Sequence, residues 1–188
     1  MVNYTSIDIL EAIPSDNFEC IVYGSPRALQ RPRFFQRRSP AVGRPVRGHR
    51  NRGIYNPSFA LQDEMRSLIV GALPQNQGIF FPEAVPLKVV VKFYMPRPDN
   101  HFPRRDAFSL ALPNLVDRMI DNVFSRYRST PHLRTPDADN MVKFVLDHPL
   151  QGVIYANDSF VTEITAEKMF DDTNECTGRT YIAVTKAE

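Results

Sequence analysis

Alternating hydrophobic and polar residues predict several β-strands along the chain. Residues 18–24 (FECIVYG) have the composition of a first strand and end at a glycine. Residues 87–95 alternate, with hydrophobic side chains on one face and lysines on the other. Residues 160–170 and 179–186 resemble two further strands, and the Asp, Thr, Asn and Gly residues between them favour a turn. The last two strands are therefore expected to form an antiparallel hairpin.

Hydrophobic residues at helical spacing predict three helices. The first covers residues 57–72, with Asn56 as its cap. The second covers residues 111–127. The third begins with Asp139 as N-cap and is stopped by Pro149, because proline cannot continue a regular helix.

The order of these elements favours an α+β fold. Strand, helix, strand, inserted helix, helix, strand, strand is typical of a mixed β-sheet with helices packed on it. At 188 residues the chain is expected to form a single domain, 1–188. Residues 1–17 are expected to be a peripheral arm with weak helical character around Ile7–Ile13, and residues 99–134 an insertion.

Composition bears on the compartment. The chain contains no run of 18 hydrophobic residues, and its first residues lack the basic and then hydrophobic pattern of a secretory signal. Its two cysteines, Cys20 and Cys176, have no metal-binding spacing and are expected to be reduced thiols. We expect an intracellular protein with no membrane partner. The sequence leaves open whether it works in a cytoplasm or nucleoid, an organelle or a nucleus.

Positive charge is concentrated in one segment, although the formal net charge is only +2. Residues 25–56 hold nine arginines and no acid, and their prolines favour a basic loop or hairpin over a helix. Phe34, Phe35 and Tyr55 lie among the arginines and can stack on unpaired bases, which favours nucleic-acid binding over a disordered linker or a nuclear-targeting run. The arginines expected to contact phosphates are Arg27, Arg31, Arg33, Arg37, Arg38, Arg44 and Arg47.

Acidic residues surround the third predicted helix. Asp137 and Asp139 lie two residues apart at its start, and Lys143 and Asp147 continue the same polar stripe. Asp158 follows in a turn-rich loop before the next strand. Carboxylates of this kind can hold Mg²⁺, and a lysine can stabilise charge on a phosphate. The alternative is purely structural, because aspartate often caps a helix or forms a turn.

These residues resemble the signature of the RusA family of Holliday junction resolvases. The shared pattern is Asp137-x-Asp139-Asn140-x-x-Lys143-x-x-x-Asp147, followed by Gly152 and Asp158. Two positions depart from it. His148-Pro149 stands where the family usually continues the helix, which suggests a shortened helix. Asn157 stands where an acid often precedes the loop aspartate, so a fourth carboxylate is missing there.

The resemblance implies a site and an activity. Asp137, Asp139 and Asp158 would be the catalytic metal ligands, for Mg²⁺ with Mn²⁺ as a substitute, and Lys143 would be required for catalysis. The partner would be branched DNA, a four-way junction, cut by a homodimer with paired symmetric nicks in DNA recombination and repair. The products would carry 5′-phosphate and 3′-hydroxyl ends.

Three alternatives remain at this stage. The same chemistry can serve a structure-selective nuclease that cuts flaps or forks. The acids can be mere capping groups in a non-catalytic protein that binds branched DNA. The arginine and aromatic segment alone is compatible with a small RNA-binding protein. Asp171 and Asp172, at the end of strand 160–170, are expected to be solvated rather than to bind metal.

Overall fold

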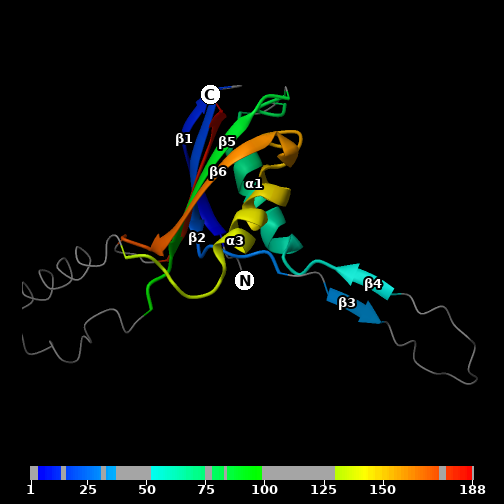
Figure 1. The fold of residues 1–188 in the computed structure, drawn as a ribbon, viewed down its shortest axis with the longest axis vertical. Coiled ribbons are helices and arrows are strands. Elements are labelled where there is room, and N and C mark those ends of the chain that lie inside the picture. The colour runs from blue at the N-terminus through cyan, green and yellow to red at the C-terminus, as the bar shows by residue number, and fades with distance from the viewer. Residues whose placement is uncertain are drawn as a thin grey trace, which may run out of the picture.

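Five strands form one mixed β-sheet in the part of the chain that the structure describes, and two helices lie on one side of it (Figure 1). The structure, a computed structural model, describes residues 4–13, 16–30, 33–36, 52–74, 78–82, 84–98, 130–173 and 177–187. The sheet strands are β1 (Tyr4–Ile13), β2 (Asn17–Gly24), β5 (Leu87–Met95), β6 (Val161–Phe170) and β7 (Arg179–Lys186). This architecture confirms the α+β class.

The strand order in the sheet is β1-β2-β7-β5-β6. β5 pairs in parallel with β6 and antiparallel with β7, so it separates the two strands expected to form a hairpin. The predicted β6–β7 hairpin is therefore wrong. A parallel β5–β6 pair needs a crossover connection, and the helix α3 (Ala138–Val145) lies in that connection.

Residues 4–13 form a strand rather than an arm with helical character. β1 pairs antiparallel with β2 over its length, for example Ile7 opposite Val22 and Ile13 opposite Asn17. Ile7 and Ile9, two residues apart, pack against the core as the two-residue period of a strand requires. Pairing with a neighbouring strand outweighs the weak local preference for helix.

The core lies between the sheet and the helices. Val89, Val91 and Phe93 of β5 are buried, as their alternation predicted, and they belong to one hydrophobic cluster with Met65 and Phe144. Met65 comes from α1 (Phe59–Ala72) and Phe144 from α3. The helix expected over 57–72 is thus confirmed, and so is its burial against the sheet.

The N-cap of α1 differs from the prediction. Ser58 occupies the N-cap position and makes no side-chain capping hydrogen bond. Asn56, the expected cap, lies two residues earlier, and its Oδ1 accepts a hydrogen bond of 3.0 Å from the Ser58 N–H. Asn56 therefore forms a turn that leads into the helix.

The basic segment contains a two-stranded hairpin. β3 (Arg33–Gln36) and β4 (Arg52–Tyr55) pair antiparallel, and Figure 1 shows them extending away from the main sheet. This agrees with the expected basic loop or hairpin. The predicted helix at 111–127, most of the insertion 99–134 and Cys176 lie outside the described residues.

Within the described residues, no helix is both long enough and hydrophobic enough to cross a membrane.

Candidate active site

The helix α3 begins at Ala138, and its N-cap lies two residues before the predicted one. Asp137 is the N-cap, with extended backbone angles (φ −72°, ψ 141°), and Asp139 lies in the first turn, so the assignment of Asp139 as N-cap is wrong. The Asp137 side chain makes no capping hydrogen bond, and both carboxylates are exposed. Their exposure leaves them available for a ligand, and the capping interpretation loses its main support.

The helical chain continues past α3 as a π-helical turn, Leu146–Leu150, that contains Pro149. Pro149 was expected to stop the helix; the regular α-helix ends at Val145, and the π-helical turn ends at Leu150, one residue after the proline. Proline has no N–H to donate, so the regular hydrogen-bond pattern cannot pass through it. The widened turn accommodates the proline, since nearby helix carbonyls accept hydrogen bonds from side chains elsewhere in the chain. The Tyr155 hydroxyl donates to the Leu146 carbonyl over 3.0 Å.

Two side chains of α1 hold this turn. Buried Gln62 donates from Nε2 to the Phe144 carbonyl over 3.1 Å. Arg66 donates from Nη1 to the carbonyl of His148 over 2.7 Å and to that of Gln151 over 2.6 Å. Side-chain donors thus replace the helix N–H groups that the carbonyls would otherwise accept from, and they fix the chain that leads to Asp158.

Asp158 opens a single 3₁₀ turn, Asp158–Phe160, directly before β6. The capping role in this turn belongs to Asn157, whose Oδ1 accepts a 3.0 Å hydrogen bond from the Ser159 N–H. The Asp158 carboxylate is exposed. Within the described residues, it makes no hydrogen bond or ion pair, and the same holds for the carboxylates of Asp137 and Asp139.

Asp147, Asp158 and Lys143 share one electrostatic environment. Burial raises the pKa of Asp147 above its ordinary 3.8; the negative charge of Asp158 raises it further, and Lys143 opposes the shift. Burial also raises the pKa of the Tyr155 hydroxyl, with smaller contributions from Asp158 and Asp147. Asp158 therefore lies within electrostatic reach of Asp147, which follows the C-terminal end of α3.

Asp137 and Asp139 lie at the opposite end of α3. The eight residues of this helix span about 12 Å. Among the described residues, no group of three or more Asp, Glu, His or Cys side chains is close enough to hold a metal ion. The expected set of Asp137, Asp139 and Asp158 is thus not assembled as one group. Its oxygen donors still suit Mg²⁺, which commonly takes one or two carboxylates together with waters and a substrate phosphate.

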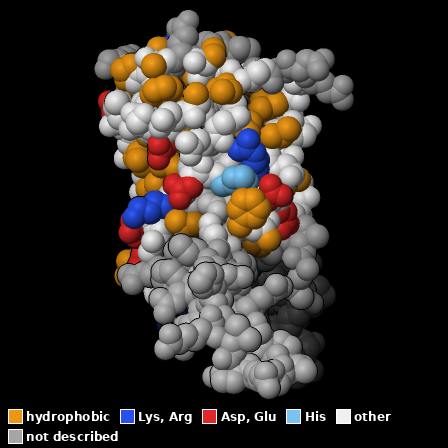
Figure 2. All heavy atoms as spheres, turned by 90° about the vertical axis from the view of Figure 1, so that its right-hand side faces the viewer, with side chains coloured by type: hydrophobic (Ala, Val, Ile, Leu, Met, Phe, Trp, Pro, Cys, Tyr) orange, Lys and Arg blue, Asp and Glu red, His pale blue; other side chains and the backbone are white. Residues whose placement is uncertain are grey.

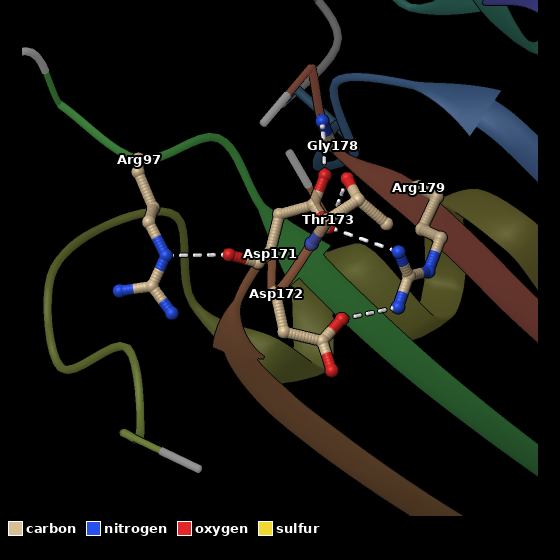
Figure 3. A network of polar contacts seen from close by, with 6 residues as sticks. All are labelled: Arg97, Asp171, Asp172, Thr173, Gly178 and Arg179. Atoms are coloured by element: carbon tan, nitrogen blue, oxygen red, sulfur yellow. Dashed lines mark hydrogen bonds and ion pairs between the residues drawn. The ribbon is translucent and has the colours of Figure 1, made fainter. Parts of the chain in front are cut away.

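Asp171 and Asp172 both make structural contacts (Figure 3), and the expectation of solvation is wrong for Asp171, which is buried, whereas Asp172 is partly exposed. Asp171 is 1% exposed; its carboxylate accepts hydrogen bonds from the Gly178 N–H (2.9 Å) and from Arg179 (3.0 Å). Asp172 pairs with the same guanidinium, and Arg97 donates to the Asp171 carbonyl. The network joins the ends of three strands, β5, β6 and β7. The sequence signal for this network is an Asp followed by turn formers, a pattern that solvated turns share.

The basic segment departs from the body beside α3. The Leu29 N–H donates to the Asn140 carbonyl over 2.9 Å, which ties the segment to the first turn of the helix. Arg27 and Arg33 are exposed there. The other arginines expected to bind phosphates lie outside the described residues: Arg31, Arg37, Arg38, Arg44 and Arg47. Figure 2 shows the side of the molecule that lies to the right in Figure 1, where acidic and basic side chains gather among hydrophobic ones.

Comparison with known proteins identifies the family. The family model for endodeoxyribonuclease RusA matches residues 24–185, which is most of the chain and includes the complete aspartate motif. No curated protein matches the chain. The family match confirms the resemblance drawn from the motif, and nucleases of this kind generally depend on a divalent metal. The chain therefore belongs to the RusA family of endodeoxyribonucleases, the Holliday junction resolvases.

Proposed function

We propose that this enzyme resolves four-way DNA junctions by paired, symmetric, Mg²⁺-dependent nicks, with Mn²⁺ able to replace Mg²⁺. One observation carries the proposal. Asp137, Asp139 and Asp158 lie at a helix start and in a turn, where aspartates often cap or form turns. All three carboxylates are nevertheless exposed and have no hydrogen-bond or ion-pair partner among the described residues. Exposed acids without a structural role, in the motif of a nuclease family, are the expected ligands of its metal.

The three aspartates would hold the metal between the start of α3 and the start of β6. A bound Mg²⁺ supplies polarisation of the scissile phosphate and a lowered pKa for the attacking water. Exposed Lys143 lies one helical turn after Asp139 and would stabilise negative charge on the phosphate or the leaving oxygen. Because the acids are not gathered into one group, Asp158 would join a metal held by Asp137 and Asp139 only after the chain rearranges on DNA binding, with waters and a DNA phosphate as the other ligands.

The arginine segment would hold the junction. It is tied to the helix that carries Asp137 and Asp139, so phosphates bound by Arg27 and Arg33 would lie close to that helix. Contacts of this kind make affinity strongly dependent on salt. A four-way junction has two-fold symmetry, and a homodimer with one site per subunit would nick its two strands in pairs, as recombination and repair require.

Mapping of the nicks tests the substrate. Labelled four-way junctions, flaps, forks and single strands of matched sequence would be incubated with the enzyme in Mg²⁺. The proposal predicts symmetric nicks in two opposing strands of the junction, with 5′-phosphate ends, and much slower cutting of the other substrates. Preferred cutting of flaps or forks would instead identify a structure-selective nuclease with the same chemistry.

A further inference from the structure

The side chain of Lys168, near the end of β6, binds the segment that leads into α3. Its ammonium donates hydrogen bonds of 2.7 Å to the carbonyl oxygens of both Arg134 and Pro136. The Pro136 carbonyl belongs to the peptide group that joins Pro136 to Asp137. The two hydrogen bonds therefore act on the backbone immediately before an expected metal ligand.

The backbone of the same segment also lies along the end of β6. The His132 N–H donates to the Lys168 carbonyl over 3.1 Å, and the Phe170 N–H donates to the Thr130 carbonyl over 3.2 Å. Beyond residue 132, the next described hydrogen bonds between this segment and β6 come from a side chain, the Lys168 ammonium. The end of β6 is itself anchored, since buried Asp171 follows it directly (Figure 3).

We propose that Lys168 is a positioning residue that orients the Asp137 carboxylate for metal binding; this proposal rests on the proposed function. Within the described residues the Asp137 side chain makes no hydrogen bond that would set its direction, so the direction depends on the backbone before it. Lys168 fixes that backbone by two charge-assisted hydrogen bonds from a strand of the main sheet. Residues that orient a ligand in this way commonly change metal affinity by about 10–100-fold when they are lost.

The test compares Lys168→Met with Lys88→Met. Methionine keeps most of the apolar stem and removes the donors. Lys88 is a matched control, a half-exposed lysine of β5 that pairs with Glu163 on the same sheet and makes no described contact with the α3 segment. Three quantities would be measured: Mn²⁺ binding to the free protein by electron paramagnetic resonance, the Mn²⁺ concentration that gives half-maximal cleavage, and junction affinity in EDTA.

Lys168→Met should weaken Mn²⁺ binding, and raise the Mn²⁺ concentration for half-maximal cleavage, by about tenfold or more. Its junction affinity in EDTA should stay within about twofold of the wild type, and Lys88→Met should match the wild type in all three measurements. Lys168→Arg, which keeps the charge and several donors, should recover part of the loss.

Wild-type Mn²⁺ affinity in Lys168→Met would overturn the positioning role while leaving the proposed function intact. If the wild type itself neither bound Mn²⁺ nor cut the junction, the proposed function would fail and this inference with it. If circular dichroism showed Lys168→Met to be unfolded, Lys168→Gln would take its place with the same expected direction, and equality of the glutamine variant with the wild type would reject the proposal.

Discussion

Arg66 of α1 donates a 2.6 Å hydrogen bond to the backbone carbonyl of Gln151, which lies in the chain between the motif helix and Asp158. The core helix α1 thus fixes the backbone that leads to Asp158, although α1 itself holds no expected catalytic residue. The motif spans more than twenty residues, and the contacts that shape it come partly from a helix some 85 positions earlier in the chain.

Replacing Arg66 should destabilise the protein. Arg66→Met removes a charged donor shared by the His148 and Gln151 carbonyls, and hydrogen bonds to charged groups contribute about 1.5–3 kcal/mol. We expect the free energy of unfolding in urea to fall by about 2 kcal/mol, whereas Lys186→Met, at an exposed position near the chain end, should change it little. An Arg66 variant as stable as the wild type would show that these contacts do not support the loop.

Replacing Asp171 should lower the free energy of unfolding more than replacing Arg66 does. The carboxylate is buried, and Asp171→Ala would remove the acceptor of the Gly178 N–H and one of the two carboxylates that bind Arg179. Breaking a buried ion pair from one side commonly costs about 3–5 kcal/mol. Asp172→Ala is the matched control, because Asp172 binds the same guanidinium from a more exposed position and should cost clearly less. Thermal unfolding of both variants would measure the difference; equal losses would contradict the central place given to Asp171.

Asp147 should make stability depend on pH. Its pKa is raised in the folded protein, so the folded state holds a proton more tightly than the unfolded chain does. The stabilisation that the Asp147 proton contributes is therefore fully present at pH values below the ordinary pKa of 3.8. It is lost as the pH rises through the higher pKa of the folded state. In EDTA, Asp147→Asn should have a higher melting temperature than the wild type at neutral pH, and the gap should narrow toward acid pH. A constant gap would show that Asp147 does not titrate as described.

Arg33 should contribute to DNA binding through charge. It is exposed at the start of the basic hairpin, and a lysine or arginine that neutralises one phosphate adds about 0.9 to the slope of log affinity against log salt. Arg33→Ala should therefore lower the salt slope of junction binding by about one, while a half-exposed lysine changed at the opposite side of the sheet, Lys88→Ala, should not. An unchanged slope would remove Arg33 from the DNA interface.

The fold could be predicted where local pattern decides it. The alternation in 87–95 and 179–186 gave strands with the observed bounds, and the helical period gave α1 to within two residues. The pairing of β6 could not be read from the turn residues that follow it, because the central strand β5 comes from far earlier in the chain. For β1, pairing with β2 decided the structure and local propensity did not.

The site followed from the sequence only in part. Motif spacing made Asp137, Asp139, Lys143 and Asp158 the expected site residues, and the family match spans their positions. Their distance from one another depends on the path of the π-helical turn and the following loop, which is set by contacts with Gln62 and Arg66 of another helix. No local pattern reports such contacts, and for that reason the expected convergence of three carboxylates was not a safe inference from spacing.

Cleavage of a labelled four-way junction tests the central claim most directly. Wild type, Asp139→Asn and Asp16→Asn would be compared in Mg²⁺ and in EDTA, where Asp16 is an exposed acid at the β1–β2 turn, outside the motif. The account predicts Mg²⁺-dependent paired nicks by the wild type and by Asp16→Asn, and junction binding without cleavage by Asp139→Asn. Undiminished cleavage by Asp139→Asn would contradict the assignment of this carboxylate to the metal site.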